Sequence, residues 1–250
     1  MNKNNYVKKL TITSFLIGAS LILSLFSRMI YFPGGGTGMR IGISSYISCL
    51  PSFLFGPLWG GMTMGVMDVL AFILKPEGGF LLPITLTAIL GGVLRGFLWK
   101  KLKNLKIPFI PCVIFFVAVM ILGVLNFLAH KYGILHHGFI NNFGKKLGFI
   151  TFLPISVGVI GIALLIFNKG ISKTKFYSEK FLNVLSVLLI SNIIVTTINT
   201  FVLIIFIPSL SKVAFAYFFI PRLAEEIANT SIQSYVVSYL LKLSEKIYTK

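Results

Sequence analysis

Long apolar segments separated by short polar ones make up most of the chain. A helix needs about 20 mostly apolar residues to cross a bilayer, because each residue advances it by about 1.5 Å. The second and third apolar segments meet at Gly56-Pro57, which we interpret as a tight turn between two helices. The apolar segments predict eight helices, at residues 10–32, 42–56, 57–75, 82–99, 107–130, 147–168, 181–207 and 213–241.

The composition agrees with a chain that lies in a membrane. Hydrophobic residues make up 56% of the sequence and charged residues 12%, with only 6 acidic residues. A soluble globular protein has about a quarter of its residues charged, so this chain lacks the side chains needed to cover a water-facing surface. We therefore predict an all-α integral membrane protein with a single membrane domain over residues 1–250.

The formal net charge of +17 does not indicate a nucleic-acid partner, because the lysines form short clusters between the apolar segments. Lysines in such clusters mark cytoplasmic loops of membrane proteins. Placing both termini in the cytoplasm puts about twice as many basic residues inside as outside. The inside clusters are then at 3–9, 100–106, 169–180 and 242–250, while 131–146 lies outside. We expect a multi-pass protein of the plasma membrane.

Five ionisable residues interrupt the apolar segments. A charge near the middle of a bilayer costs several kcal/mol by most measures, so each needs a reason to be there. Internal pairing between helices and a role in function are both open for Arg95, Arg222, Glu225 and Glu226. A functional role is favoured for Asp68, because it is the only aspartate and lies far from either end of its helix.

Several catalytic activities are excluded or disfavoured by the motifs. The chain has no G-x-x-x-x-G-K-[ST] sequence, so we expect no ATPase site and no cofactor of its own. Glu225-Glu226 is similar to the Glu-Glu-x-x-x-Arg motif of some intramembrane proteases, but Thr230 stands at the arginine position. The histidines at 130, 136 and 137 have no carboxylate or cysteine beside them, which disfavours a metal site.

Two glycine-rich segments, 33–40 and 75–79, fall on the outer side of the predicted topology, where we expect loops that act as a lid. Small residues also recur at a spacing of four within the predicted helices. Among them, Ser14 and Gly18 lie in a helix whose other residues are mostly large and apolar. Small residues at this spacing allow close approach of another helix.

Several short motifs occur in order along the chain: Arg40-Ile-Gly-Ile, Leu-Phe-Gly-Pro-Leu-Trp-Gly-Gly at 54–61, Asp68, Pro83-Ile-Thr-Leu-Thr-Ala88, Gly91, Gly96, Ile-Asn-Thr at 198–200 and Pro221-Arg222-Leu. Together they resemble the substrate-binding S-components of energy-coupling-factor (ECF) vitamin transporters, most closely the folate branch. The resemblance covers residues 8–101 and 179–243, in order. S-components have six helices, so the resemblance implies a six-helix core with an inserted helical hairpin at 102–178 and about eight transmembrane helices in all.

The resemblance implies a subunit that captures a vitamin outside the cell and is not an enzyme. Its partners would be a membrane T-component and two cytoplasmic ATPases, which use the ATP. In the family a small-residue pattern on the first helix docks the T-component, and Ser14 and Gly18 stand at these positions.

The ligand that the resemblance favours is folate or a related pterin; pantothenate, a queuosine precursor and, from another class, an intramembrane enzyme remain alternatives. A carboxylate suits the donor pair of a pterin ring, and guanidinium groups suit acidic groups. We therefore assign Asp68 to the ring and the arginines to acidic groups of the ligand. The substrate-binding residues that we expect are Arg40, Asp68, Thr85, Asn199 and Arg222.

Overall fold

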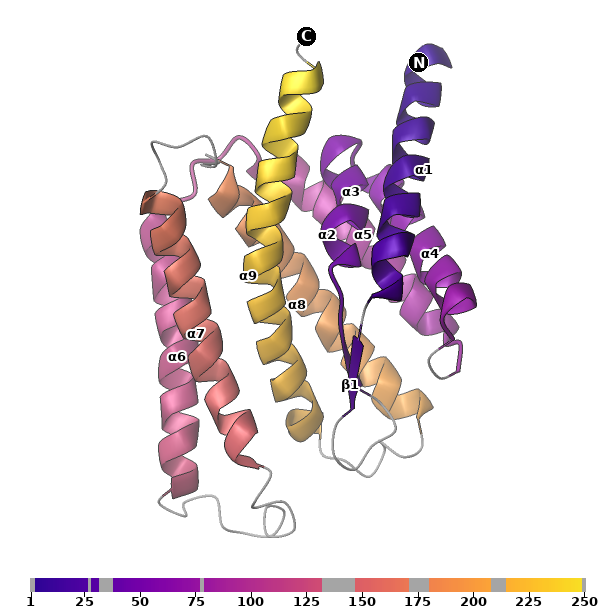
Figure 1. Ribbon diagram of the computed structural model, residues 1–250. Helices are drawn as coiled ribbons and strands as arrows, with labels where there is room; N and C mark the ends of the chain where they lie inside the picture. Colours follow the sequence, from indigo (N-terminus) through magenta and orange to yellow (C-terminus); the bar gives the residue numbers. More distant parts are fainter. Residues whose placement is uncertain are drawn as a thin grey trace.

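The computed structural model describes residues 3–26, 28–31, 38–76, 79–131, 147–170, 180–207 and 215–248 (Figure 1). Seven long helices, two short helices and one pair of strands form within these residues. In chain order these are α1 (Lys3–Leu25), β1 (Arg28–Tyr31), β2 (Gly38–Ile41), α2 (Ser44–Ser48), α3 (Leu50–Leu54), α4 (Pro57–Leu74), α5 (Leu82–Leu102), α6 (Phe109–Lys131), α7 (Leu147–Gly170), α8 (Phe181–Phe206) and α9 (Phe215–Tyr248).

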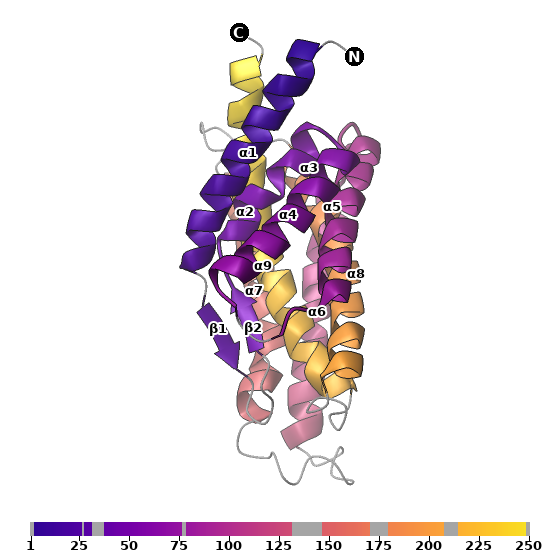
Figure 2. The ribbon, with the colours of Figure 1, turned by 90° about the vertical axis from the view of Figure 1, so that its right-hand side faces the viewer.

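The long helices form a bundle in which consecutive helices from α4 to α9 run in opposite directions, while α1 runs in the same direction as α4 (Figure 1). Figures 1 and 2 show α1 beginning and α9 ending at the same end of the bundle, with the β1–β2 ribbon toward the opposite end. Four of the helices are long and apolar enough to cross a membrane, namely Asn5–Leu25 within α1, and α4, α5 and α8. Shorter apolar helical stretches, Phe109–Leu125 and Pro154–Gly170, lie within α6 and α7.

Two predicted helices differ from the structure in extent. The segment 42–56 forms the short helices α2 and α3, of 5 residues each, instead of one long helix. The segment 10–32 ends its helix at Leu25, and Arg28–Tyr31 instead pairs with Gly38–Ile41 as an antiparallel ribbon. Backbone that is no longer in a helix must find other hydrogen-bond partners, and a strand pair supplies them. Residues 38–40, the last part of the segment predicted to be a glycine-rich loop, therefore belong to strand β2.

The tight turn that Gly56-Pro57 predicts is present between α3 and α4. Gly56 has φ +95°, a conformation that glycine adopts without steric cost, and Pro57 opens α4. The chain folds back so closely that a Cβ on Gly60 would come within 2.3 Å of the Ser52 Oγ atom. A Cβ on Gly92 of α5 would come within 2.3 Å of the Gly60 carbonyl oxygen. These glycines therefore set the close packing of α3, α4 and α5.

Helices α6 and α7 pack side by side and stand against α9 at the side of the bundle away from α1 (Figure 1). Their apolar contact with the rest of the bundle includes Phe116, Leu165, Phe181 and Ile227, all buried. A second core cluster, around Cys49, Trp99 and Val187, joins α2, α3, α5, α8 and α9. The bundle is thus one continuous packed body with α6 and α7 as an outer pair.

Candidate functional site

A polar cavity of about 270 Å³ lies where α2, α5, α8 and α9 meet. Its walls include Gly42 and two serines at the start of α2, directly after strand β2. Its charged and amide side chains come from the middle of long helices. These are Arg95, Asn192, Asn199, Arg222, Glu226, Asn229 and Gln233.

Helical periodicity explains why these side chains share one cavity. On α8 the lining residues recur at Asn192, Thr196 and Asn199, and on α9 at Arg222, Glu226, Asn229 and Gln233. Spacings of three and four residues place side chains on one face of a helix. Each helix therefore carries a polar stripe, and the two stripes face each other across the cavity.

Arg95 on α5 supplies a buried positive charge, with 6% of its surface exposed. Its Nε and Nη2 atoms donate hydrogen bonds to the Asn192 Oδ1 atom at 3.3 Å and 2.8 Å. Its Nη1 atom lies 3.7 Å from the Met64 sulfur. Burial of a charge is costly without a partner of opposite charge, and Glu226, which lines the same cavity, interacts electrostatically with Arg95.

A chain of hydrogen bonds fixes the position of Arg95. Asn192 donates from Nδ2 to the Thr230 hydroxyl at 2.8 Å and to Gln233 Oε1 at 3.4 Å. Gln233 in turn donates to the backbone carbonyl of Ser45 at 2.9 Å. The network joins α5, α8, α9 and α2, so the guanidinium is held in one orientation at the cavity wall.

Arg222 and Glu226 are one turn apart on α9 and both line the cavity. The Thr196 and Thr230 hydroxyl groups donate hydrogen bonds to the Glu226 carboxylate, the latter at 3.5 Å. Beside them, the Tyr46 hydroxyl donates to Asn229 Oδ1 at 2.7 Å, which ties α2 to α9. The cavity thus offers two guanidinium groups and one carboxylate within a ring of amides and hydroxyls.

The structure places two of the predicted substrate residues, Asn199 and Arg222, in this cavity. The Thr87 hydroxyl donates a hydrogen bond to Asn199 Oδ1, which links α5 to α8. Arg40 lies on β2 and is paired with Met29 of β1; the structure describes its backbone and not its side chain.

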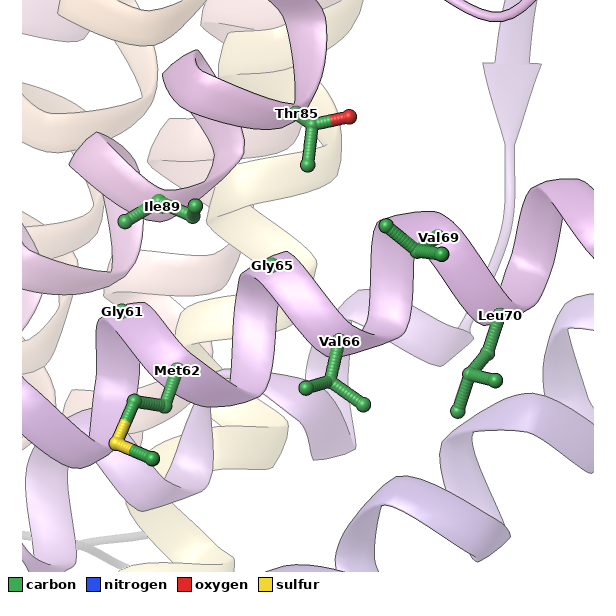
Figure 3. Close-up of a pocket in the computed structure, with 8 residues that line it drawn as sticks. All are labelled: Gly61, Met62, Gly65, Val66, Val69, Leu70, Thr85 and Ile89. Carbon is green, nitrogen blue, oxygen red and sulfur yellow. The ribbon is translucent and has the colours of Figure 1, made fainter. Parts of the chain in front are cut away.

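The predicted residues Asp68 and Thr85 are brought together elsewhere, between α4 and α5. The Thr85 hydroxyl donates to Asp68 Oδ2 at 2.7 Å. Thr85 also lines a second hollow of about 500 Å³, which Figure 3 shows with Gly61 and Gly65 of α4 facing Ile89 of α5. Its walls are almost entirely apolar, so it suits hydrocarbon chains and not a polar ligand.

The residues proposed to dock a partner helix are on an open face. Ser14 is exposed, and a Cβ added to Gly18 would meet nothing within 4 Å. Their helix, α1, lies at the side of the bundle away from α6 and α7 (Figure 1). The outer helix pair therefore leaves this face uncovered.

Residues 8–157, more than half of the chain, match the family model of the ECF transporter, substrate-specific component. The chain belongs to this family. A comparison with curated proteins finds no match. A substrate-specific component is the substrate-binding subunit of a transporter, and with its apolar spans this one is a multi-pass membrane protein.

The segment that matches the ECF substrate-specific components includes Arg95 and the α2 wall of the cavity. The polar stripes of α8 and α9 lie beyond residue 157, outside the segment that matches the family. Among the residues that line the cavity, sequence analysis identified Arg95 and Glu226 as charges that are costly inside a membrane, but it did not assign them to the substrate site. Asn192, Thr196, Asn229 and Gln233 were missed, although their helical spacing was a readable signal.

Proposed function

We propose that this chain is the substrate-capture subunit of an ECF importer in the plasma membrane. It binds a vitamin in the polar cavity from the outside and then delivers it inward. A T-component and two cytoplasmic ATPases couple ATP hydrolysis to this delivery. The observation that carries the proposal is the cavity itself, where buried Arg95 and the facing polar stripes of α8 and α9 surround a space of about 270 Å³. Such groups are costly inside a membrane and mark a substrate site.

The arrangement of the chain ends supports the direction of capture. The termini of the bundle lie at one end, and that end also carries Lys100 and Lys101 at the close of α5. The Lys169 Nζ atom of α7 lies 5.4 Å from the centre of the Phe109 ring, at the start of α6. Lys169 belongs to the basic cluster at 169–180, which is also predicted to be cytoplasmic. Positive charge marks the cytoplasmic side. The cavity adjoins β2 near the other end and would then face outward.

Folate or a related pterin is the ligand that the sequence resemblance favours, with pantothenate or a queuosine precursor as alternatives. Arg222 and Asn199 are supported as ligand contacts because they line the cavity. The resemblance also implies Arg40, Asp68 and Thr85 as contacts, but Asp68 and Thr85 bond each other away from the polar cavity. The modest cavity volume favours the smaller of these ligands, because sites for drug-sized molecules are typically about 300–1,000 Å³.

Ser14 and Gly18 are proposed to dock the T-component. Their support is the open face of α1, where exposed Phe15 and Ile22 flank the small residues. A small-residue patch between large apolar side chains lets a second helix approach closely within a bilayer.

Native mass spectrometry of the full-length protein purified in mild detergent tests the function. We expect a small molecule retained by the wild type and lost from Arg222→Gln. An affinity tag on the same protein should recover a T-component and two ATPases from its own membranes. Absence of both the ligand and the ATPases would contradict a role in ECF transport and favour a membrane enzyme or scaffold.

A further inference from the structure

The charged side chains that the structure describes at the polar cavity are balanced within the protein. Arg95 of α5 interacts electrostatically with Glu226 of α9, and both line the cavity. Arg222 interacts in the same way with Glu226 and with Glu225, the adjacent residue on α9. Two positive groups thus face two negative ones. An ion on the ligand would find no spare counter-charge among these groups, and a buried charge without a counter-charge is costly.

A chain of hydrogen bonds joins Arg95 to Glu226 through uncharged side chains. Arg95 donates from Nη2 to Asn192 Oδ1 at 2.8 Å, and Asn192 donates from Nδ2 to the Thr230 hydroxyl at 2.8 Å. Thr230 then donates to Glu226 Oε1 at 3.5 Å. A guanidinium has only donors and a carboxylate only acceptors, so the direction of each bond in this chain is determined. The charge and its counter-charge are therefore connected without help from a ligand.

Amide groups remain to contact a ligand. Asn199 of α8 and Asn229 of α9 both line the cavity. Within the described residues each has one hydrogen-bond partner, the Thr87 hydroxyl for Asn199 and the Tyr46 hydroxyl for Asn229. A side-chain amide has two N–H groups and two lone pairs, so it can take part in four hydrogen bonds. The remaining capacity suits uncharged groups such as carbonyls, hydroxyls and ring nitrogens.

We propose that the polar cavity selects an uncharged polar ligand, which forms hydrogen bonds with Asn199 and Asn229. Glu226 excludes acidic analogues, because it neutralises Arg95 and repels a carboxylate placed beside it. This inference rests on the proposed function, since it names the ligand class of the capture site. It departs from folate, the ligand that the sequence resemblance favours, because folate carries two carboxylates.

The charge of the ligand that the purified full-length protein retains tests the class directly. We expect native mass spectrometry, with identification of the released compound, to find a molecule that has no ionised group at neutral pH. Calorimetry on the ligand-free protein then compares matched pairs, namely nicotinamide with nicotinate, panthenol with pantothenate, and pterin with pterin-6-carboxylate. In each pair that binds, the uncharged compound should bind at least about 10-fold more tightly.

Glu226→Gln tests the origin of this preference. The substitution removes the counter-charge of Arg95 with little change in volume, so the acid of each pair should gain affinity relative to its uncharged partner. The preference should fall below about threefold or reverse. Glu245→Gln is the matched control, because it makes the same chemical change near the C-terminal end of α9. Its preference should equal that of the wild type.

Asn199→Ala tests the amide contact. The uncharged ligand should bind about 10-fold more weakly, as expected for the loss of hydrogen bonds inside a buried site. Asn168→Ala is the control, because Asn168 is a buried amide of α7 that is not part of the described lining. Equal losses of affinity in the two variants would overturn the amide contact.

The outcomes separate the two proposals. A retained ligand that is ionised at neutral pH, or an acid that binds more tightly than its uncharged partner, overturns the ligand class and leaves the capture function standing. An unchanged preference in Glu226→Gln, or the same change in Glu245→Gln, overturns the role of Glu226. Failure to retain any ligand and to bind any of the compounds contradicts the capture function itself.

Discussion

Arg95 on α5 and Asn192 on α8 are joined by two hydrogen bonds to one amide oxygen, from Nε at 3.3 Å and from Nη2 at 2.8 Å. Asn192 cannot turn away, because its Nδ2 atom donates to Thr230 and Gln233 on α9. The same contact therefore holds the bundle together and aims a guanidinium at the cavity. We therefore expect stability and ligand recognition to be coupled through this amide.

Asn192→Ala should lower both stability and affinity. It removes the acceptor of Arg95 and leaves buried donors without a partner, which costs about 1–3 kcal/mol for each neutral group and more for a charged one. We expect a clear fall in the Tm of the ligand-free protein in detergent and a loss of ligand binding, measured by thermal unfolding and calorimetry.

Asn168→Ala on α7 is the matched control for this prediction. Asn168 is as buried as Asn192, within a few per cent, but its Oδ1 atom has no hydrogen-bond partner among the described residues. The control should reduce the Tm much less and leave binding intact. Equal losses in the two variants would show that the amide network contributes nothing beyond buried volume.

Asp68 and Thr85 allow a ligand role to be separated from a packing role. If Asp68 contacts the ligand, Asp68→Asn weakens binding about 10- to 100-fold, because a charge-assisted hydrogen bond contributes about 1.5–3 kcal/mol. Because its bonded partner is Thr85 and neither residue faces the polar cavity, we expect the other result. Asp68→Asn and Thr85→Val should each lower the Tm while the folded protein binds normally.

A variant that combines Asp68→Asn with Thr85→Val decides between a role in ligand binding and a role in helix packing. Two residues that act through one hydrogen bond show non-additive losses, whereas independent residues add. We expect the Tm of Asp68→Asn with Thr85→Val to be close to that of the more damaging single variant. Additive losses together with weakened binding by Asp68→Asn alone would restore Asp68 to the substrate site.

The positions of the helices could be predicted from the sequence, because an apolar segment of bilayer length has few alternatives to a helix. The polar stripes of α8 and α9 were also present in the spacing of Asn192, Thr196, Arg222 and Glu226. The helices that each stripe faces could not be predicted from the sequence. Arg95 meets Asn192 across 97 residues of chain, and no local pattern reports which helices face each other.

The selection of Asp68 shows where a rule based on position alone reaches its limit. Distance from the helix ends identified a costly carboxylate, and such a group needs a partner. That partner depends on how α4 packs against α5, which Gly60 and Gly92 determine by letting their backbones touch. Packing, and not depth in the membrane, placed Asp68 beside Thr85.

Ser14→Leu and Gly18→Leu should abolish uptake and leave ligand binding to the isolated subunit nearly unchanged. Leucine on this face prevents close approach of a partner helix. It should not disturb the fold, because the space around Gly18 is open. Uptake into vesicles that contain the whole transporter and calorimetry on the subunit alone measure the two effects.

Ala163→Leu provides the control for the docking face. Ala163 is also small and exposed, but it lies on α7 in the outer helix pair, away from α1. Uptake by this variant should be normal. Transport that persists in both α1 variants, or fails equally in Ala163→Leu, would show that α1 is not the docking face.

Labelling of a single cysteine tests the orientation of the bundle. The lysine distribution places 131–146 outside and 100–106 inside. Asn141 lies outside the described residues, between the Lys131 end of α6 and the Leu147 start of α7. With Cys49 and Cys112 replaced, Asn141→Cys should react with a membrane-impermeant maleimide added to whole cells.

Lys103→Cys in the same background is the matched position at the other end of the bundle, just after α5. It should react only after the membrane is opened, because α6 carries the chain from this end of the bundle to the far end. The reverse pattern would place the termini outside and direct the polar cavity toward the cytoplasm. Labelling at both positions in intact cells would mean that α6 does not cross the membrane.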